Sequence, residues 1–189
     1  MQTKICAFTG HRQNKFHFGF DEQHKDCIKI KNAIREQICF LIAEGYNYFI
    51  SGMALGVDQW AAEIVLELKI ANPNIILESA LPCITQASKW AEEQRSRYID
   101  LLAKSDIITY VNYHYSETCM TDRNKYMADK ADTLIAVLNE PQLHSNLHRS
   151  GTLQTVNYAI KKGKRVIIIN PNTAEIMPLS RLNPIMTEI

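Results

Sequence analysis

The segment from Tyr46 to Glu63, YNYFISGMALGVDQWAAE, constrains the fold of this chain more than any other stretch. Aromatic and β-branched residues at 48–50 predict a short strand, and Gly52 and Gly56 follow it. From Val57 onward, apolar residues recur at helical spacing. A strand, a glycine-bearing turn and a helix can point backbone N–H groups at an anion. The spacing GxxxGxD is neither the dinucleotide fingerprint nor a P-loop, so a purely structural turn is the alternative.

The alternation of strand and helix continues along the chain. Short β-branched runs predict strands over residues 4–9, 48–50, 75–81, 107–111, 133–138 and 165–170. Apolar spacing predicts helices over 26–44, from 57 to a break at 72–74, and over 88–104, 121–131 and 151–162. Such alternation favours right-handed crossovers between parallel strands. We therefore expect an α/β fold, Rossmann-like and doubly wound, with a mostly parallel sheet and helices on both faces.

The chain shows no linker and no internal repeat. Its 189 residues suit one compact α/β domain, so we expect a single domain over residues 1–189. Residues 171–189 carry three prolines and are expected to form a weakly structured tail.

Composition argues against several classes of protein. The formal net charge is +1 and the sequence pI about 7.7, which gives no general attraction to nucleic acid or to an anionic membrane. No apolar run approaches the ~18 residues that a membrane span needs, and no signal peptide precedes the first strand. The five cysteines are scattered and form no CxxC pair, as expected of reduced thiols. We expect a cytoplasmic protein with no membrane partner.

Unusual residues gather where the predicted strands end. Residues 10–12 (Gly-His-Arg) follow the first strand, residues 51–52 (Ser-Gly) follow the second, and residues 150–152 (Ser-Gly-Thr) open the last helix. Ligands of open parallel sheets bind outside the carboxyl ends of the strands, so these segments are expected to share one site. The predicted ligand-binding residues are Gly10, His11, Arg12, Ser51, Gly52, Gly56, Asp58, Arg123, Asn124, Ser150, Gly151 and Thr152.

Each candidate residue has a chemical role and a structural alternative. The hydroxyl and N–H groups of residues 150–152 suit a phosphate at a helix N-terminus, although Ser150 also suits a simple N-cap. Arg12 can hold a phosphate through its bidentate fork, or it is a solvated loop residue. His11 suits stacking on a base or a hydrogen bond to a ribose, and otherwise is an exposed loop histidine. Asp58 suits ribose hydroxyls, but it equally suits the first turn of a helix as a favourable charge.

The remaining candidates depend on the middle of the chain. Gly52 and Gly56 would bracket a second anion cradle, and Arg123 with Asn124 would complete the pocket. Trp60 is expected in the core, because it shares a helix face with apolar neighbours.

The sequence predicts no metal and no resident cofactor. His144 and His148 are four residues apart, but they lie in a Ser/Asn-rich loop without a carboxylate or cysteine at matching spacing. No Ser-His-Asp arrangement and no nucleophile elbow is present, so the catalytic residues, if the protein has any, are not identified.

Taken together, four segments resemble the YpsA-like family. They are TGHR at 9–12, SGMALGVDQWAAE at 51–63, the stretch 89–132, and SGTLQTVNYAIKKGKRVIII at 150–169. That family belongs to the SLOG superfamily of Rossmann-like domains, together with the DNA-processing protein DprA and the Lonely Guy (LOG) phosphoribohydrolases. The resemblance covers residues 3–170 and implies a pocket for a nucleotide or a nucleotide-derived ligand. It also implies a signalling role in bacteria or phages and, as is frequent in SLOG-type domains, pairing into a homo-oligomer.

One departure from the resemblance bears on catalysis. LOG enzymes carry a catalytic glutamate in PGGxGTxxE, and Thr155 stands at the matching position of this sequence. A hydroxyl cannot replace a carboxylate as a general acid/base near neutral pH. The resulting hypothesis is a protein that binds or senses a nucleotide without chemistry of its own.

Two other hypotheses stay open. The first is a nucleotide hydrolase of the phosphoribohydrolase or N-glycosidase type, with Asp58, Glu63 or His11 as its acid/base. The second is a DprA-like module for single-stranded nucleic acid or for protein interaction. We do not expect nucleic acid as the partner, because the chain has little excess positive charge.

Overall fold

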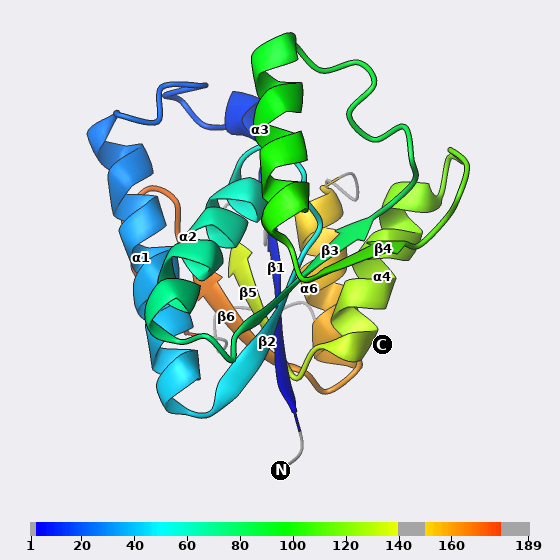
Figure 1. Ribbon diagram of the computed structural model, residues 1–189. Helices are drawn as coiled ribbons and strands as arrows, with labels where there is room; N and C mark the ends of the chain where they lie inside the picture. The colour runs from blue at the N-terminus through cyan, green and yellow to red at the C-terminus, as the bar shows by residue number, and fades with distance from the viewer. Residues whose placement is uncertain (1–2, 140–149, 179–189) are drawn as a thin grey trace, which may run out of the picture.

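The computed structural model describes residues 3–139 and 150–178. The protein folds around a mixed sheet that has helices on both of its faces (Figure 1). Seven strands follow the order β4-β3-β2-β1-β5-β6-β7. The first six are parallel, and β7 pairs antiparallel to β6. The strands are β1 Lys4–Gly10, β2 Tyr46–Ser51, β3 Ile76–Leu81, β4 Ile107–Tyr110, β5 Thr133–Val137, β6 Arg165–Ile169 and β7 Ile176–Met177. The predicted Rossmann-like α/β fold is thereby confirmed.

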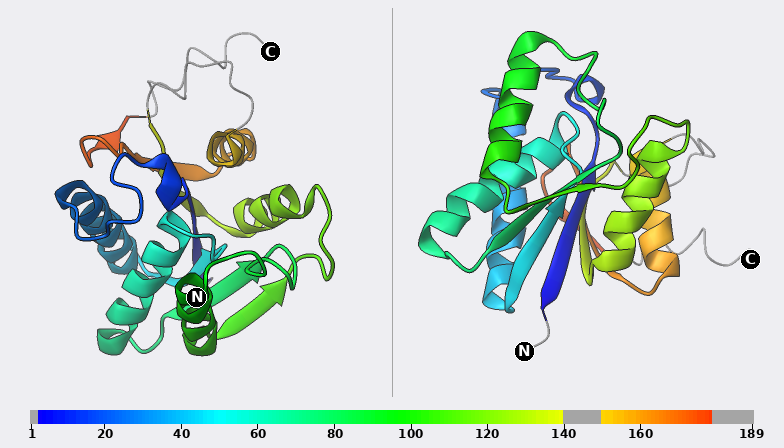
Figure 2. Two further views of the ribbon diagram at one scale, coloured as in Figure 1. Left: turned by 90° about the horizontal axis from the view of Figure 1, so that it is seen from above. Right: turned by 45° about the vertical axis from the view of Figure 1, so that its right-hand side comes forward.

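Helices cover the two faces of the sheet unequally (Figure 2). The helices α1, α2 and α3 pack on one face, and α4 and α6 pack on the other. Their bounds are α1 Lys25–Ala43, α2 Val57–Ala71, α3 Glu92–Lys104, α4 Cys119–Lys130 and α6 Gly151–Lys161, with a short 3-10 helix η1 at Gln13–Lys15. None of the helices within the described ranges is long and apolar enough to cross a membrane.

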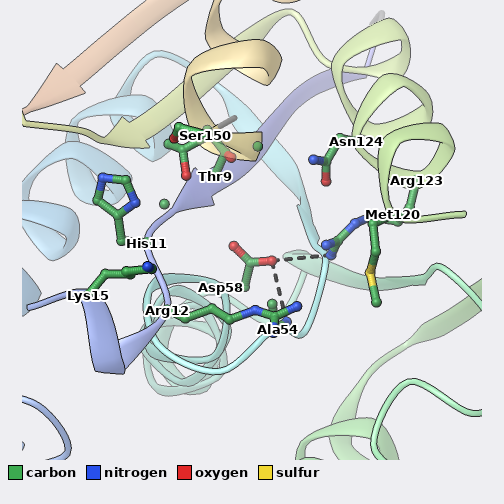
Figure 3. A pocket seen from close by; sticks show the side chains of 13 residues that line it. Thr9, His11, Arg12, Lys15, Ala54, Asp58, Met120, Arg123, Asn124 and Ser150 are labelled. Carbon is green, nitrogen blue, oxygen red and sulfur yellow. Dashed lines mark hydrogen bonds and ion pairs between the residues drawn. The ribbon is translucent and has the colours of Figure 1, made fainter. Parts of the chain in front are cut away.

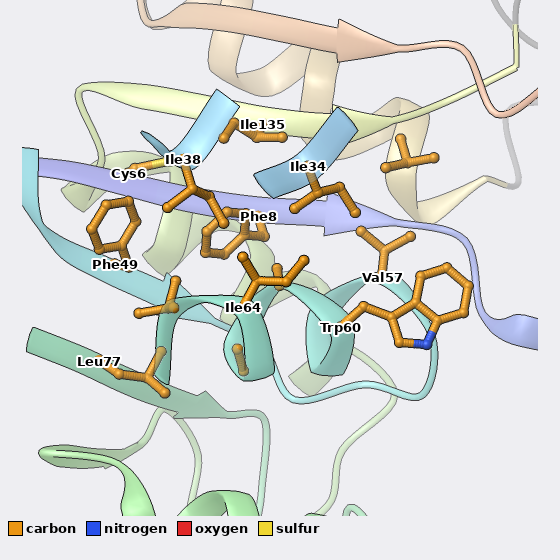
Figure 4. Packing of buried hydrophobic residues seen from close by; sticks show 14 of the residues in the cluster. Cys6, Phe8, Ile34, Ile38, Phe49, Val57, Trp60, Ile64, Leu77 and Ile135 are labelled. Atoms are coloured by element: carbon orange, nitrogen blue, oxygen red, sulfur yellow. The ribbon is translucent and has the colours of Figure 1, made fainter. Parts of the chain in front are cut away.

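Alternation along the strands supplies a separate core to each face. In β1, Cys6 and Phe8 face the side of α1 and α2, whereas Ala7 between them faces the side of α4 and α6. Figure 4 shows Phe8 enclosed by Ile38 of α1 and Ile64 of α2. The first core contains the aromatic rings of Phe8, Phe49 and Trp60, whereas the second core is richer in alanine.

The order of the strands places a switch point beside β1. The chain steps outward from β1 through β2 and β3 to the edge strand β4, and then returns to place β5 on the other side of β1. The chain therefore runs from β1 toward β4 on one side of β1 and from β5 toward β7 on the other side. In open α/β sheets the crevice at the carboxyl ends of such strands is where ligands bind.

Two predicted elements differ from the structure. The third helix begins at Glu92 rather than at residue 88, because residues 84–90 form successive turns and the Ala91 N–H donates to Gln94 Oε1 at 3.2 Å. The stretch from residue 171, which we expected to be weakly structured, contains the strand β7. Its two residues pair with Ile168 and Ile169 at the edge of the sheet, a long-range contact without a local signal. Residues 179–189 lie outside the described part.

Loop 11–24 is fixed to three helices by a network of charged side chains. Glu22 binds Lys31 of α1 and Arg97 of α3, and Arg97 also donates to Glu63 of α2 at 2.7 Å. Burial by itself raises the pKa of Glu22, but hydrogen bonds from Arg97 and Lys31 outweigh it and lower the pKa from 4.5 to about 2. This network holds the loop against the layer formed by α1, α2 and α3.

The core of the larger face can be tested with two substitutions in one helix. Ile34 of α1 is fully buried, whereas Ile28 of the same helix is 42% exposed. We predict that Ile34→Ala lowers the free energy of unfolding by about 2–4 kcal/mol through lost burial and a cavity. The matched change Ile28→Ala should cost about 0.5 kcal/mol or less. Urea unfolding followed by circular dichroism measures both, and equal costs would contradict the assignment of this face to the core.

The lowered pKa of Glu22 predicts a dependence of stability on pH. Because the pKa is about 2 in the folded state and near 4.5 when unfolded, the carboxylate stabilises the fold fully above pH 4.5. That contribution is lost as the pH falls from 4.5 toward 2. Relative to the wild type, Glu22→Gln should therefore be less stable by about 1–3 kcal/mol at pH 7, and the difference should shrink below pH 4. Urea unfolding at a series of pH values measures this difference, and a constant difference would refute the assignment.

Candidate functional site

A cavity of about 440 Å³ lies at the carboxyl ends of the strands beside the switch point (Figure 3). Its walls come from the end of β1, the loop through η1, the turn between β2 and α2, and the first turns of α4 and α6. The lining residues are Thr9, Gly10, His11, Arg12, Lys15, Ala54, Asp58, Met120, Arg123, Asn124, Ser150, Gly151 and Thr152. Segments far apart in the sequence thus meet at one edge of the sheet.

The N-terminus of α6 forms one wall of the cavity. Ser150 is the N-cap, and its hydroxyl accepts a hydrogen bond from the Leu153 N–H at 3.4 Å. The first N–H groups of a helix have no partner within the helix, and the helix dipole makes this end positive. Gly151 is exposed and lines the cavity, so its main chain is open to a ligand. This end of α6 has the features of an anion-binding helix terminus.

Basic side chains line the cavity on the opposite side. Arg12 and Lys15 are both exposed, and Figure 3 shows them with His11 on the loop that follows β1. Two cations and a helix N-terminus therefore border the same space. This charge distribution attracts a negatively charged group.

A buried ion pair closes the floor of the cavity. Arg123 of α4 donates from Nη1 to Asp58 Oδ2 of α2 at 3.2 Å, and both side chains are less than 10% exposed. The Ala54 N–H donates to the same carboxylate oxygen at 3.4 Å. Burial raises the pKa of Asp58 while Arg123 opposes that shift, and burial likewise lowers the pKa of Arg123. The pair connects the two helical layers directly below the cavity.

The structure corrects the prediction of a second anion cradle between Gly52 and Gly56. A Cβ atom on Gly52 would lie 1.3 Å from Arg123 Nη1, so the guanidinium already fills that space. Gly56 has φ of 95° and packs on the main chain after β1, where an added Cβ would lie 2.7 Å from the His11 carbonyl oxygen. The two glycines do not line the cavity. They admit Arg123 and allow the turn to approach the first loop.

Ser51 is also a structural residue of this turn. Its buried hydroxyl donates to the Asp58 carbonyl oxygen at 2.7 Å and accepts from the Met53 N–H at 3.1 Å. The other nine predicted ligand-binding residues line the cavity together. They are Gly10, His11, Arg12, Asp58, Arg123, Asn124, Ser150, Gly151 and Thr152.

Sequence reasoning missed four lining residues: Thr9, Lys15, Ala54 and Met120. Thr9 adjoins the predicted triplet at the end of β1, so its position was available from the sequence. Lys15 reaches the cavity only because η1 turns the loop back, and the irregular sequence of that loop gives no periodic signal. Met120 lies at the start of α4, which begins two residues earlier than predicted.

The histidines that lie close together in the structure are not the pair considered as metal ligands from the sequence. His144 and His148 lie outside the described residues. The structure instead brings His17 and His24 of loop 11–24 together with Asp26 of α1. This group lies apart from the lining of the 440 Å³ cavity.

Comparison with known proteins finds close relatives by sequence. The sequence profile described as the YspA SLOG family (YpsA) matches residues 6–173. A UPF0398 protein of Halalkalibacterium halodurans is 32% identical over 139 residues, which cover 72% of this chain and 73% of that protein. A UPF0398 protein of Bacillus thuringiensis (strain Al Hakam) is 31% identical over 141 residues, with 72% and 75% covered.

A solved structure shares the fold. DNA processing protein A from Helicobacter pylori, described for its unique single-stranded DNA binding mode, matches with a TM-score of 0.51 and 18% identity. The match covers 87% of this chain but only 64% of that one, less than two thirds of its length. At this identity the similarity concerns the fold alone.

Because Asp58 and Arg123 form a buried ion pair below the cavity, we predict that their contributions to stability are strongly coupled. Asp58→Ala leaves a buried guanidinium without its partner and should cost about 3–5 kcal/mol of stability. The double variant with Arg123→Ala should cost at least about 1 kcal/mol less than the sum of the single changes. Urea unfolding of the wild type, both single variants and the double variant gives this coupling energy. Additive costs would show that the two side chains do not interact as described.

Proposed function

Because the chain belongs to the YspA SLOG family, we propose that it binds or senses a nucleotide or a nucleotide-derived ligand in the cavity at the switch point. The observation that carries this proposal is the N-terminus of α6, which borders the same cavity as the cations Arg12 and Lys15. Main-chain amides of Gly151 and Thr152 would hold a phosphate there, with the helix dipole adding to the attraction. The resemblance to the YpsA-like family, first drawn from the sequence, is confirmed by the family match.

The shape and lining of the cavity support a ligand larger than phosphate alone. Its volume of about 440 Å³ falls within the usual ~300–1,000 Å³ of small-molecule sites. Asn124 offers hydrogen-bond groups, Met120 offers apolar surface, and His11 offers a ring on the opposite wall. A phosphate at α6 with a sugar and a base across the remaining space fits this distribution of polar and apolar groups.

Binding without chemistry is favoured by the state of the candidate acid/base groups. Thr155, at the position of the LOG glutamate, is buried and donates its hydroxyl to the Gly151 carbonyl oxygen at 2.7 Å. It therefore supports the first turn of α6 rather than offering a group to a ligand. Glu63 binds Arg97 and does not line the cavity. The proposed role is that of a nucleotide-binding or sensing protein.

A hydrolase is the second candidate function, and one observation favours it. Asp58 lines the cavity, and burial raises its pKa, which is a property of carboxyl groups that act as general acids or bases. Its ion pair with Arg123 opposes that role. Chromatography of nucleotides incubated with the protein decides between the two: free base or released phosphate, lost in Asp58→Asn, would establish the enzyme.

A single-stranded nucleic acid is the third candidate ligand. The DNA processing protein A structure shares the fold and was described for binding single-stranded DNA, which weighs against dismissing nucleic acid. Phosphates of such a strand would meet Arg12 and Lys15. A gel shift with a fluorescent oligothymidine tests this: binding that falls steeply with salt and with Arg12→Ala would support it, and unchanged mobility at low salt would exclude it.

We further propose that the protein works in a reducing compartment, in keeping with the expected cytoplasmic location. All five cysteines are free, with Cys6, Cys27, Cys83 and Cys119 buried and Cys39 exposed. An exposed unpaired thiol suits a cytosolic environment better than an oxidising one.

Binding at the start of α6 can be tested with one small substitution. A Cβ atom on Gly151 would meet only Asn124 Nδ2, at 3.9 Å, so Gly151→Ala leaves the fold intact and places a methyl group on the proposed phosphate site. Isothermal titration with AMP, ADP, ADP-ribose and NAD should find a ligand for the wild type. We predict at least about tenfold weaker binding by Gly151→Ala, a loss of about 1.4 kcal/mol.

The matched control is Asn157→Ala, an exposed change two turns along the same helix. It should bind as the wild type does. Equal affinity of Gly151→Ala and Asn157→Ala would contradict a phosphate site at the N-terminus of α6, and a flat titration with the whole panel would count against nucleotide binding itself.

A further inference from the structure

His17, His24 and Asp26 form a compact cluster where loop 11–24 enters α1. One ligand atom of each residue lies within 4.8 Å of the ligand atoms of the other two. Asp26 Oδ2 lies 3.1 Å from His17 Nε2 and 3.7 Å from His24 Nδ1. We propose that these three side chains bind a divalent transition-metal ion of the zinc type. The proposal does not depend on the nucleotide site, because none of these three residues lines the 440 Å³ cavity.

The distances within the cluster match the needs of a small metal ion. Zinc binds imidazole nitrogen and carboxylate oxygen at ~2.0–2.2 Å in tetrahedral geometry, which places neighbouring ligand atoms ~3.3–3.5 Å apart. The separations of 3.1 and 3.7 Å bracket that value. The two imidazole nitrogens lie within 4.8 Å of each other, and the rings would turn toward a common point to bring all three atoms into range. Water would complete the coordination, since the His17 side chain is 60% exposed.

Packing, rather than the metal, positions the histidine that is distant in sequence. Phe16 and Phe18 stack on each other with their ring centroids 5.1 Å apart, and both rings contact Trp60. His17 lies between these anchored residues in the chain, and its ring contacts that of His24 at 5.2 Å. The loop is thus already folded in a shape that brings the rings of His17 and His24 together. A site that is largely formed in advance loses little conformational entropy when an ion binds.

His24 has a structural role that an ion would replace. It is the N-cap of α1, and its Nδ1 accepts a hydrogen bond from the Asp26 N–H at 3.2 Å. Nδ1 is therefore the unprotonated ring nitrogen, and its lone pair, which now accepts from the Asp26 N–H, is the one that a metal ion would take. After coordination, the Asp26 N–H would turn to solvent, as N–H groups of a first helical turn commonly do.

The surrounding charges determine which ions fit. Lys29 Nζ lies 3.7 Å from Asp26 Oδ1, and the positive charge of Lys25 also stabilises this carboxylate in its ionised form. These cations and the helix N-terminus weaken the purely electrostatic attraction for a hard ion such as Mg²⁺ or Ca²⁺. Two imidazoles favour zinc, copper, nickel and cobalt instead. We therefore expect binding of Zn²⁺ and Co²⁺ and none of Mg²⁺.

An ion at this position would clamp the loop that forms one wall of the cavity. His17 borders a smaller hollow of about 220 Å³ together with His11, Lys15 and Asn139. Coordination would tie that loop to α1 in addition to the Glu22 network. The measurable consequence is a higher melting temperature with the ion present.

The experiment uses the full chain carrying Cys39→Ser, which removes the exposed thiol that would otherwise bind zinc. Calorimetric titration with ZnCl₂ in chelator-treated buffer should show one ion bound per chain through this cluster. His17→Ala and Asp26→Asn should each weaken binding at least about tenfold. His114→Ala, which removes an exposed ring from another loop, is the matched control and should bind as the parent does.

Two further measurements distinguish metal binding from a purely structural role of the histidines. Co²⁺ should give a visible absorption band from nitrogen and oxygen coordination that disappears in His17→Ala. Zn²⁺ should raise the melting temperature of the parent and of His114→Ala, but not that of His17→Ala. The proposal is overturned if the parent binds no Zn²⁺ at 100-fold molar excess, or if His17→Ala binds and responds as the control does.

Discussion

The ion pair between Asp58 and Arg123 is the interaction on which the architecture of the site depends. It joins α2 on one face of the sheet to α4 on the other, across the carboxyl ends of the strands. Burying either charge alone is costly, so each side chain requires the other. Gly52 at the end of β2 makes the pair possible, because only the absence of a side chain leaves room for the guanidinium. The floor of the cavity is therefore set by a glycine and two charges that lie far apart in the sequence.

Above that floor, the topology of the sheet brings the remaining groups together. The loop after β1 supplies Arg12 and Lys15, and the return to β5 and β6 supplies the N-terminus of α6. These segments all lie at the carboxyl ends of the strands, because β1 to β6 are parallel. The cavity thus collects positive groups from several loops without a cluster of basic residues in the sequence. This arrangement explains how a chain with a formal net charge of +1 has positive groups concentrated around one cavity.

Much of the fold could be predicted from the sequence, because its signals are local. The β-branched runs of the six parallel strands and the apolar spacing of α1 and α2 reflect burial that each segment needs by itself. The strand β7 and the start of α3 were not predicted, since they depend on pairing and turns without periodicity.

The lining of the candidate site could be predicted in part for the same reason. Residues 10–12 and 150–152 follow from strand ends and a helix cap, and they do line the cavity. Gly52 and Gly56 were misassigned because the groups that pack against them, the Arg123 guanidinium at Gly52 and the main chain of residues 11–13 at Gly56, are brought there only by tertiary packing. Native mass spectrometry of gently purified protein tests the central claim most directly. We predict that the wild type carries a nucleotide-sized mass that is absent from Gly151→Ala. Bare protein in both samples, or the same bound mass in both, would contradict it.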